Sequence, residues 1–228
     1  MRILLVSATA AEIGPVTAEL RHKGCVDQRL TSYRSNGHDV DVLVTGVGMV
    51  ATASWCSLVL SRGRYDVALN LGVCGSFDRA LLPGTVVHVV SDRLAELGAE
   101  DGDAFLSIHQ LRLLDENEPP YVKGRLVNEA PPLNPTLSAL PTVSAITVNT
   151  VHGHEQSIAS VKERFAPQVE SMEGAAFMYA CLIFGQRFAQ IRAVSNVVER
   201  RNRDAWKLPE AITSLGSVTL RMLSELWG

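Results

Sequence analysis

Runs of apolar residues divide the chain into predicted strands. The run from Arg2 to Val6 shows no alternation between apolar and polar positions, which is typical of a strand covered on both faces in a parallel sheet. Two further runs, residues 30–35 and 39–44, flank Asn36-Gly37, a strong signal for a hairpin turn. Four more strands are predicted at residues 65–71, 86–92, 143–148 and 188–194.

Helices are predicted between these strands. The segment after the first strand predicts a helix that runs to about His22 and stops at Gly24, and another opens at Met49 and ends near Arg62. Further helices are expected at residues 155–165, 174–184 and 209–227. This succession predicts an α/β fold: one domain over residues 1–228, with a mixed, twisted central sheet flanked by helices.

One long segment has no clear periodicity. Residues 96–135 are largely polar and rich in turn signals. Loops of this length in compact domains are usually functional, or carry structure that a single sequence hides.

Composition narrows the class of protein. A chain of 228 residues is long enough to bury one large core. Its net charge of −3 gives no basic field for nucleic acid, so a small polar substrate is the easier expectation. The apolar stretches fall short of the ~20 residues that a membrane helix needs. Four scattered cysteines, with no C-x-x-C pair and no secretory leader, favour reduced thiols in a cytoplasmic protein.

Two glutamates stand at predicted helix starts. Glu12 follows the first strand closely, where α/β sheets place their ligands. Glu173 precedes a helix that is apolar on nearly every face and is therefore expected to be buried all round. The helix dipole stabilises a carboxylate at either place. Each glutamate is consequently either a helix-start residue or a ligand-binding one, and these residues alone leave both alternatives open.

The segment Met172-Glu173-Gly174-Ala175 resembles the Met-Glu-Ala or Met-Glu-Gly signature of the nucleoside phosphorylase and nucleosidase family. Three other family-like segments occur in the right order, so that the resemblance covers nearly the whole chain. It implies that Glu173 binds the ribose 2′- and 3′-hydroxyls and that Met172 packs on the sugar. It also implies that Glu12 orients and deprotonates a water molecule.

The resemblance assigns further binding residues. The run Gly72-Val73-Cys74-Gly75 resembles the family's turn beneath the sugar and base. Cys74 is expected to be a wall residue, because its neighbours are apolar and no histidine lies within a few residues.

Residues 149–154 match the family's base-binding loop, which includes Val151 and His152. His152 and His154 could suggest a metal, but no third ligand lies nearby and the family uses none. In the family, the region that corresponds to residues 96–135 makes a subunit contact. Phe105 or Leu106 is expected to enter the neighbouring subunit's site.

Asn196 departs from the family pattern. Most purine-specific relatives carry Ser-Asp where this chain has Ser195-Asn196, and the aspartate protonates N7 of the base. An amide cannot donate an acid's proton. In the wider family, asparagine at this position accompanies 6-oxopurines, so Asn196 favours hypoxanthine over adenine.

Two more features indicate the reaction and the substrate. Residues 7–12 contain no cation that could hold phosphate, so water is the expected nucleophile. Residues 199–207 carry several cations and Trp206. This segment is either an ordinary solvated loop or, as the family resemblance implies, a lid over the 5′ end of the nucleoside. A cationic lid, with Arg201, Arg203 or Lys207 as the contact, suits an aromatic carboxylate. The combination resembles the futalosine hydrolases of an alternative menaquinone pathway, whose substrate is an inosine with a 5′ extension ending in a benzoate.

The sequence thus predicts a nucleoside N-ribosyl hydrolase that needs no metal or cofactor. The expected partners are a nucleoside, water and further copies of the chain in a homodimer or larger assembly, without nucleic acid or membrane. Two enzymatic alternatives remain, a methylthioadenosine/adenosylhomocysteine nucleosidase and a purine nucleoside phosphorylase. A nucleoside-binding protein without activity is the third, although retention of both glutamates argues against it.

Overall fold

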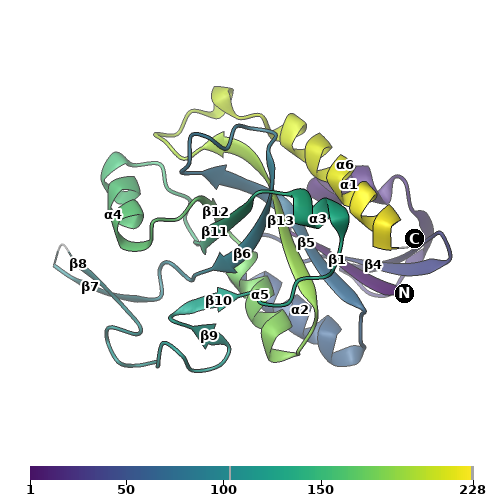
Figure 1. The fold of residues 1–228 in the computed structure, drawn as a ribbon, viewed down its shortest axis with the longest axis horizontal. Helices are drawn as coiled ribbons and strands as arrows, with labels where there is room; N and C mark the ends of the chain where they lie inside the picture. Colours follow the sequence, from purple (N-terminus) through teal and green to yellow (C-terminus); the bar gives the residue numbers. More distant parts are fainter. Residues whose placement is uncertain (103, 227–228) are drawn as a thin grey trace.

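The computed structural model describes residues 1–102 and 104–226. A large mixed sheet forms the centre, and a small hairpin projects from the body (Figure 1). The strands of the large sheet are β1 (Arg2–Ser7), β2 (Arg21–Cys25), β3 (Leu30–Ser35), β4 (His38–Val44), β5 (Val67–Ser76), β6 (Val86–Asp92), β9 (Tyr121–Val122), β10 (Arg125–Val127), β11 (Thr142–Thr147), β12 (Val169–Ser171) and β13 (Phe188–Val197); the hairpin contains β7 (Gly98–Asp101) and β8 (Ala104–Ser107). The predicted α/β fold with a mixed central sheet is confirmed.

The central strands form a closed ring. Their order runs β2-β3-β4-β1-β5-β12-β11-β6-β10-β9, and β13 pairs with both β5 and β6. β13 is parallel to β5 and antiparallel to β6, while β12 is antiparallel to β5. The ring therefore consists of β5, β12, β11, β6 and β13, and buried aliphatic side chains such as Val87 and Val194 pack together on these strands.

Helices cover both faces of the sheet (Figure 1). The helices are α1 (Ala10–Thr17), α2 (Met49–Arg62), α3 (Pro135–Ala139), α4 (Glu155–Phe165), α5 (Gly174–Ile183), α6 (Leu208–Leu226) and the short 3₁₀ turn η1 (Arg203–Ala205). Helices α1 and α6 pack together on one face, and α2 and α5 on the other.

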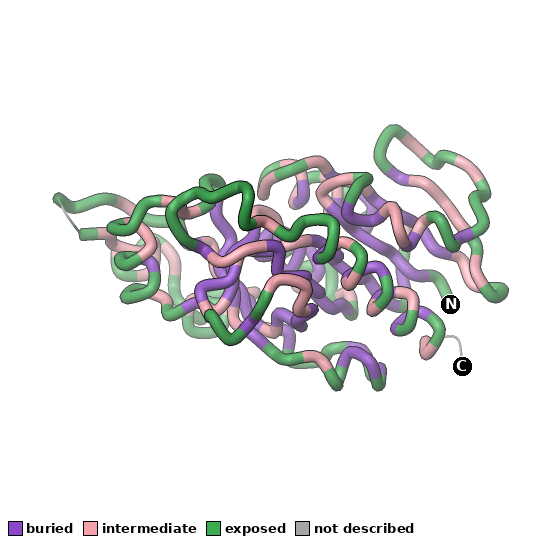
Figure 2. The backbone as a smooth tube through the Cα atoms, turned by 90° about the horizontal axis from the view of Figure 1, so that it is seen from above, coloured by how far each residue is buried: buried purple, intermediate pink, exposed green. Residues whose placement is uncertain are grey.

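Strand β1 lies between these two helical layers. It directs Ile3 and Leu5 into the core beneath α1 and α6, and Leu4 and Val6 into the core beneath α2 and α5. The central strands β1, β5, β6 and β13 are buried along most of their length, and the buried stretches of the chain run through the middle of the molecule (Figure 2). The expectation of a first strand covered on both faces is confirmed.

The predicted helix to His22 is wrong. Helix α1 ends at Thr17, and Arg21–Cys25 instead forms β2, which pairs antiparallel with β3. Pro15 lies inside α1 and supplies no N–H for the helical ladder. Pairing with β3, a contact that helical periodicity does not report, fixes the extended conformation of residues 21–25.

Two other expectations need correction, and one lies beyond the described residues. Helix α5 is not buried all round, because Tyr179, Ile183 and the adjacent Phe184 are exposed. The glycines of 72–75 do not form a turn, since β5 continues to Ser76. The predicted end of the last helix at Trp227 lies outside the described residues.

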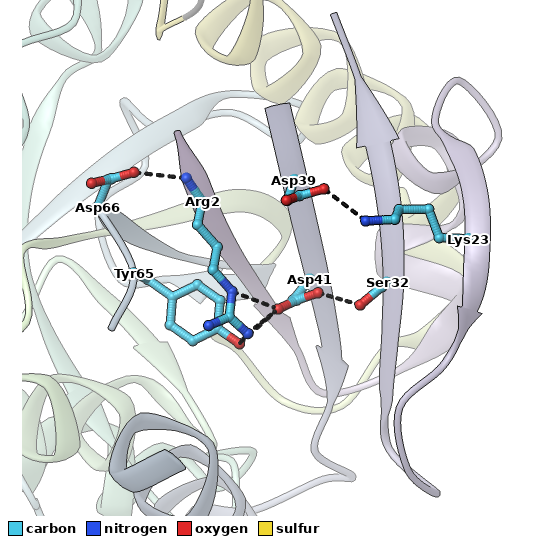
Figure 3. A network of polar contacts seen from close by, with 7 residues as sticks. All are labelled: Arg2, Lys23, Ser32, Asp39, Asp41, Tyr65 and Asp66. Carbon is cyan, nitrogen blue, oxygen red and sulfur yellow. Dashed lines mark hydrogen bonds and ion pairs between the residues drawn. The ribbon is translucent and has the colours of Figure 1, made fainter. Parts of the chain in front are cut away.

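A polar network fastens the amino end of β1 (Figure 3). The buried carboxylate of Asp41 on β4 accepts hydrogen bonds from Arg2 Nη2 at 2.8 Å, from the Tyr65 hydroxyl at 2.9 Å and from Ser32 on β3. The exposed Lys23–Asp39 pair beside it adds little stability. These contacts hold the strands together at the end opposite to Glu12, so that the carboxyl ends remain available for a site.

No helix among the described residues is long and apolar enough to cross a membrane. The four cysteines are all unpaired.

Candidate functional site

Four strands end at one edge of the sheet. β1 runs parallel to β4 and to β5, and β5 runs parallel to β13. Their carboxyl ends therefore lie side by side, as is usual for ligand sites in α/β sheets. Most of the polar residues singled out in the sequence lie at or just beyond this edge.

Glu12 is held rigidly at the end of β1. Its Oε2 accepts hydrogen bonds from Thr9 Oγ1 at 2.7 Å and from the Thr9 N–H at 3.0 Å, and the Thr9 hydroxyl caps the helix in return. Its Oε1 accepts from the Val73 N–H at 3.1 Å. A carboxylate has about four acceptor positions, so Glu12 can cap α1 and still accept a hydrogen bond from a further molecule.

Glu173 lies between β12 and α5 beside half-buried Met172. Of the two alternatives for Glu173, the side-chain cap is absent: Glu173 occupies the N-cap position but makes no capping hydrogen bond, and its Oε1 accepts from the Gly48 N–H at 2.9 Å. Burial raises the pKa of Glu173, with a smaller contribution from the charge of Glu12, while Arg192 lowers it. The two carboxylates are thus close enough to interact electrostatically.

Arg192 is a cation near both carboxylates, and the sequence interpretation missed it. Its side chain is among the largest fully buried ones, with only 2% of the residue exposed. Arg192 Nη1 and Glu12 Oε1 each lie 3.1 Å from the position that a Cβ on Gly72 would occupy. The available signal was a lone arginine in the middle of the apolar run of β13.

Glycines in β5 allow this close approach. A Cβ on Gly75 would lie 2.9 Å from Val198 Cγ2, 3.4 Å from Asn196 Nδ2 and 3.5 Å from Glu170 Cγ. Between these glycines, Cys74 is buried, and burial raises the pKa of its thiol to about 12. A thiol that stays protonated at neutral pH is a wall residue rather than a nucleophile.

A β-bulge orients Ser195 and Asn196. The register between β13 and β5 shifts between Val194 and Asn196, and bulges of this kind redirect side chains near sites. The Ser195 hydroxyl donates to Asn196 Oδ1 at 2.8 Å, while Asn196 Nδ2 donates to the Val197 carbonyl at 2.9 Å. The second N–H of the Asn196 amide remains for another acceptor.

A small cavity of about 70 Å³ lies beside Asn196. It joins the base-binding loop predicted from the sequence to the 199–207 loop: its lining includes Val151, His152, Glu170, Asn196, Arg201 and Trp206. Arg201 lies 5.4 Å from the centre of the Trp206 ring, in a cation–π arrangement.

The second missed residue is Glu170. Its carboxylate, 3% exposed as a side chain, accepts from the His152 N–H at 3.1 Å and lies 2.6 Å from His152 Nδ1. Its neighbours in the short strand β12, Val169 and Ser171, gave no signal that set it apart. His154, by contrast, is the N-cap residue of α4, so the two histidines have separate surroundings.

Two of the predicted site residues lie elsewhere in the chain. Phe105 on β8 packs against α4, where Arg164 lies 4.5 Å above its ring. Its predicted entry into a neighbouring subunit's site stays a prediction. Arg203 belongs to η1, is exposed, and does not line the cavity beside Asn196.

Comparison with known proteins identifies the family of this chain. The model of the phosphorylase superfamily matches residues 2–224. Futalosine hydrolase of Thermus thermophilus is 30% identical over 193 residues, covering 82% of this chain and 82% of that protein. Futalosine hydrolase of Acidothermus cellulolyticus is 31% identical over 219 residues, covering 93% of this chain and 86% of that protein.

A solved structure agrees with the fold. The 5′-methylthioadenosine/S-adenosylhomocysteine nucleosidase of Colwellia psychrerythraea, in complex with adenine, superposes with a TM-score of 0.81 at 22% identity. The match covers 99% of this chain and 96% of that one.

Proposed function

This chain belongs to the phosphorylase superfamily as an enzyme that hydrolyses N-glycosyl bonds, and we propose that its substrate is futalosine, from which it releases hypoxanthine. The observation that carries this proposal is the pair of buried or half-buried carboxylates, Glu12 and Glu173, at the shared strand edge. The pair supplies one base for water and one acceptor for sugar hydroxyls.

Glu12 is the proposed base. The transition state of glycoside cleavage resembles an oxocarbenium ion, so a nearby negative charge stabilises it, and a carboxylate can take the proton of the attacking water. Thr9 and Val73 fix the Glu12 carboxylate in place, which reduces the reorganisation needed during the reaction.

Glu173 is the proposed sugar-binding residue. Gly48 occupies one position on Oε1, and the remaining acceptor positions suit the ribose 2′- and 3′-hydroxyls. Met172 beside it offers an apolar surface for the sugar, with Val73, Cys74 and Gly75 beneath.

Asn196 supports hypoxanthine as the base. Because Ser195 donates to Oδ1 and one amide N–H is bound to Val197, Asn196 presents an N–H donor. N7 and O6 of a 6-oxopurine are both acceptors, whereas the amino group at position 6 of adenine would place a donor against a donor. Buried polar groups left unpaired reject the wrong substrate strongly.

The 5′ end of futalosine carries a carboxylate. Arg201 lines the cavity beside Asn196 and is stacked on Trp206, so it offers a charge-assisted hydrogen bond to that group. These features support the futalosine route of menaquinone biosynthesis as the place of this enzyme, and we propose the cytoplasm as its location.

The two enzymatic alternatives require different groups in the site. A methylthioadenosine/adenosylhomocysteine nucleosidase acts on a 6-aminopurine without a benzoate, which neither Asn196 nor Arg201 favours. A phosphorylase needs cations for phosphate. Arg192 is one cation at this edge, but its charge acts on the Glu173 carboxylate, whose pKa it lowers. Arg29 lies near Gly46 and is exposed.

Assembly forms part of the proposal. An apolar groove between α2 and α5 is lined by Val50, Leu97 and Tyr179, all of them exposed. We assign this groove to a second copy of the chain.

One assay tests the activity. Purified protein is incubated with futalosine, inosine or methylthioadenosine, with and without phosphate, and the free base is measured. We expect hypoxanthine from futalosine at a rate independent of phosphate. A rate that requires phosphate would identify a phosphorylase, preferential release of adenine would identify the other nucleosidase, and binding without turnover would identify a nucleoside-binding protein.

A further inference from the structure

The proposed reaction lacks an acid. When the C1′–N9 bond breaks, its electron pair passes to the base, and a proton on a ring nitrogen makes hypoxanthine a better leaving group. Asn196 contacts the proposed base position but has no acidic proton. Another group at this cavity must therefore supply the proton.

Few groups around the cavity can do so. Among the described residues that line it, the ionisable ones are His152 from the base-binding loop, Glu170 from β12, and Glu199 and Arg201 from the 199–207 loop. Arginine keeps its proton in proteins. Glu199 is exposed to solvent, and no hydrogen bond or ion pair in the described part of the chain orients its carboxylate toward a base. Both oxygens of Glu170 already contact His152.

His152 has the required geometry. The Glu170 carboxylate lies 2.6 Å from Nδ1, and this contact fixes a hydrogen on Nδ1 and leaves Nε2 as the nitrogen that exchanges a proton. Within the described part of the chain, Nε2 has no hydrogen-bond partner. Phe77 packs edge-on against the imidazole, with 6.1 Å between the ring centres, and limits its rotation.

The same contacts place His152 close to Asn196. Glu170 Cγ and Asn196 Nδ2 lie within 3.5 Å and 3.4 Å of one point, the position of a Cβ on Gly75. Since Glu170 holds His152 by both its main-chain N–H and its ring, the histidine is fixed at the wall of the cavity that Asn196 lines.

We propose that His152 is the proton donor to the leaving base and that Glu170 is the residue that positions and stabilises the imidazolium. This inference rests on the proposed nucleosidase function. The C1′–N9 bond breaks, its electrons go to the base, and the Nε2 proton moves to a ring nitrogen to give neutral hypoxanthine. Water oxygen bonds to C1′ and its proton goes to Glu12. Afterwards His152 takes a proton from solvent and Glu12 releases one, so that the protons balance.

Two substrates separate this role from a structural one. In 7-methylinosine the base already carries a positive charge and leaves without an acid, whereas futalosine needs one. We expect His152→Gln to lower kcat/KM for futalosine about a hundredfold or more, the usual contribution of an acid, and to change that for 7-methylinosine less than threefold. Retained turnover of 7-methylinosine also shows that the variant is folded.

The pH profile tests Glu170. In the wild type, kcat/KM for futalosine should fall on the alkaline side as the imidazolium loses its proton. Glu170→Gln keeps an acceptor for Nδ1 but removes the charge that stabilises the imidazolium, so this alkaline limb should move to lower pH. His22→Gln, a change to an exposed histidine on β2 that does not line the cavity, should change kcat/KM for neither substrate.

The outcomes are distinguishable. If His152→Gln slows both substrates equally, or leaves futalosine turnover unchanged, His152 is not the acid, while the nucleosidase function stands. If the alkaline limb of the pH profile stays at the same pH in Glu170→Gln, Glu170 does not position or stabilise the imidazolium. If the wild type hydrolyses neither nucleoside, the proposed function fails and this inference fails with it.

Discussion

Glu12 caps a helix and, under the proposed function, is also the base for water. Its carboxylate completes a capping box with Thr9 and also accepts the Val73 N–H from another strand. The capping contacts fix the side chain without using all its acceptor positions. A residue that looks like an ordinary helix-start glutamate in the sequence can therefore also be a pre-oriented base.

The substitution Glu12→Gln tests the second role. Glutamine still supports a capping box but cannot take a proton, so kcat for futalosine should fall by about a hundredfold or more while KM changes little. Steady-state kinetics measure this, and a thermal unfolding curve checks that the fold is retained. A near-normal kcat would leave Glu12 only its role at the start of α1.

At the scale of elements, the 199–207 loop lies directly after the strand that carries Asn196. The Lys207 N–H donates to the Ser195 carbonyl, and Arg201 stacks on Trp206. One end of the loop is therefore tied to the bulge at Ser195 and Asn196, and its side chains line one wall of the cavity. Arg201 lies in this lining and Arg203 does not, so under the proposed function Arg201 is the cation for the substrate's carboxylate.

Arg201→Gln should raise KM for futalosine by about tenfold, the lower end of a charge-assisted hydrogen bond, because the loop is exposed. Inosine lacks the carboxylate, so its kinetics should hardly change. Arg200→Gln removes a neighbouring exposed charge that does not line the cavity and is the matched control. Equal effects of the two substitutions would reduce Arg201 to a general electrostatic contribution.

At the scale of the whole molecule, an apolar groove lies open to solvent. Val50 on α2 is 80% exposed, and with Leu97 and Tyr179 it lines the groove between α2 and α5. Contiguous apolar surface of this kind marks interaction sites. In this fold, the face that carries α5 would then be completed by assembly.

We expect the wild type to have twice the mass of its 24.7 kDa chain in light scattering and Val50→Glu to be a monomer, because a carboxylate would be buried without a partner. Leu133→Glu is the control, since Leu133 is 95% exposed away from the groove. A monomeric wild type, or a dimeric Val50→Glu variant, would contradict the assignment.

Global stability should depend on two buried groups of β6. Burial lowers the pKa of His88 to about 4 and raises that of Asp92 to about 6. As the pH falls from 6.5 to 4, the unfolded chain takes up a proton on His88 and the folded chain does not. The contribution of His88 to the free energy of unfolding therefore falls over this range. The folded chain instead keeps the Asp92 proton, so stability from Asp92 falls as pH rises from 3.8 to 6.

These opposite trends can be separated. As the pH falls from 6.5 to 4, the free energy of unfolding of His88→Gln should rise by up to about 3 kcal/mol relative to the wild type, because the variant has no histidine to protonate on unfolding. The free energy of unfolding of Asp92→Asn should instead rise relative to the wild type as the pH increases from 3.8 to 6. Urea unfolding at several pH values measures both, and parallel profiles of wild type and His88→Gln would show that His88 titrates alike in both states.

The sequence by itself determined the local elements and the family. The apolar run of β1, the Asn36-Gly37 hairpin and the start of α2 at Met49 follow from neighbouring residues, because short-range propensities and periodicity fix them. The Met172-Glu173 signature depends likewise on adjacent residues, and it identified the family correctly.

The tertiary structure decided what depends on contacts between distant residues. Pairing with β3 made residues 21–25 a strand instead of a helix end. Closure of the ring through β13 brought Arg192 beside Glu12 and Glu173. Glu170 met His152 across 18 positions of the chain. In each case a strand or side chain could have contacted several others. The packing of the whole chain, rather than the neighbouring residues in the sequence, determines which contact forms.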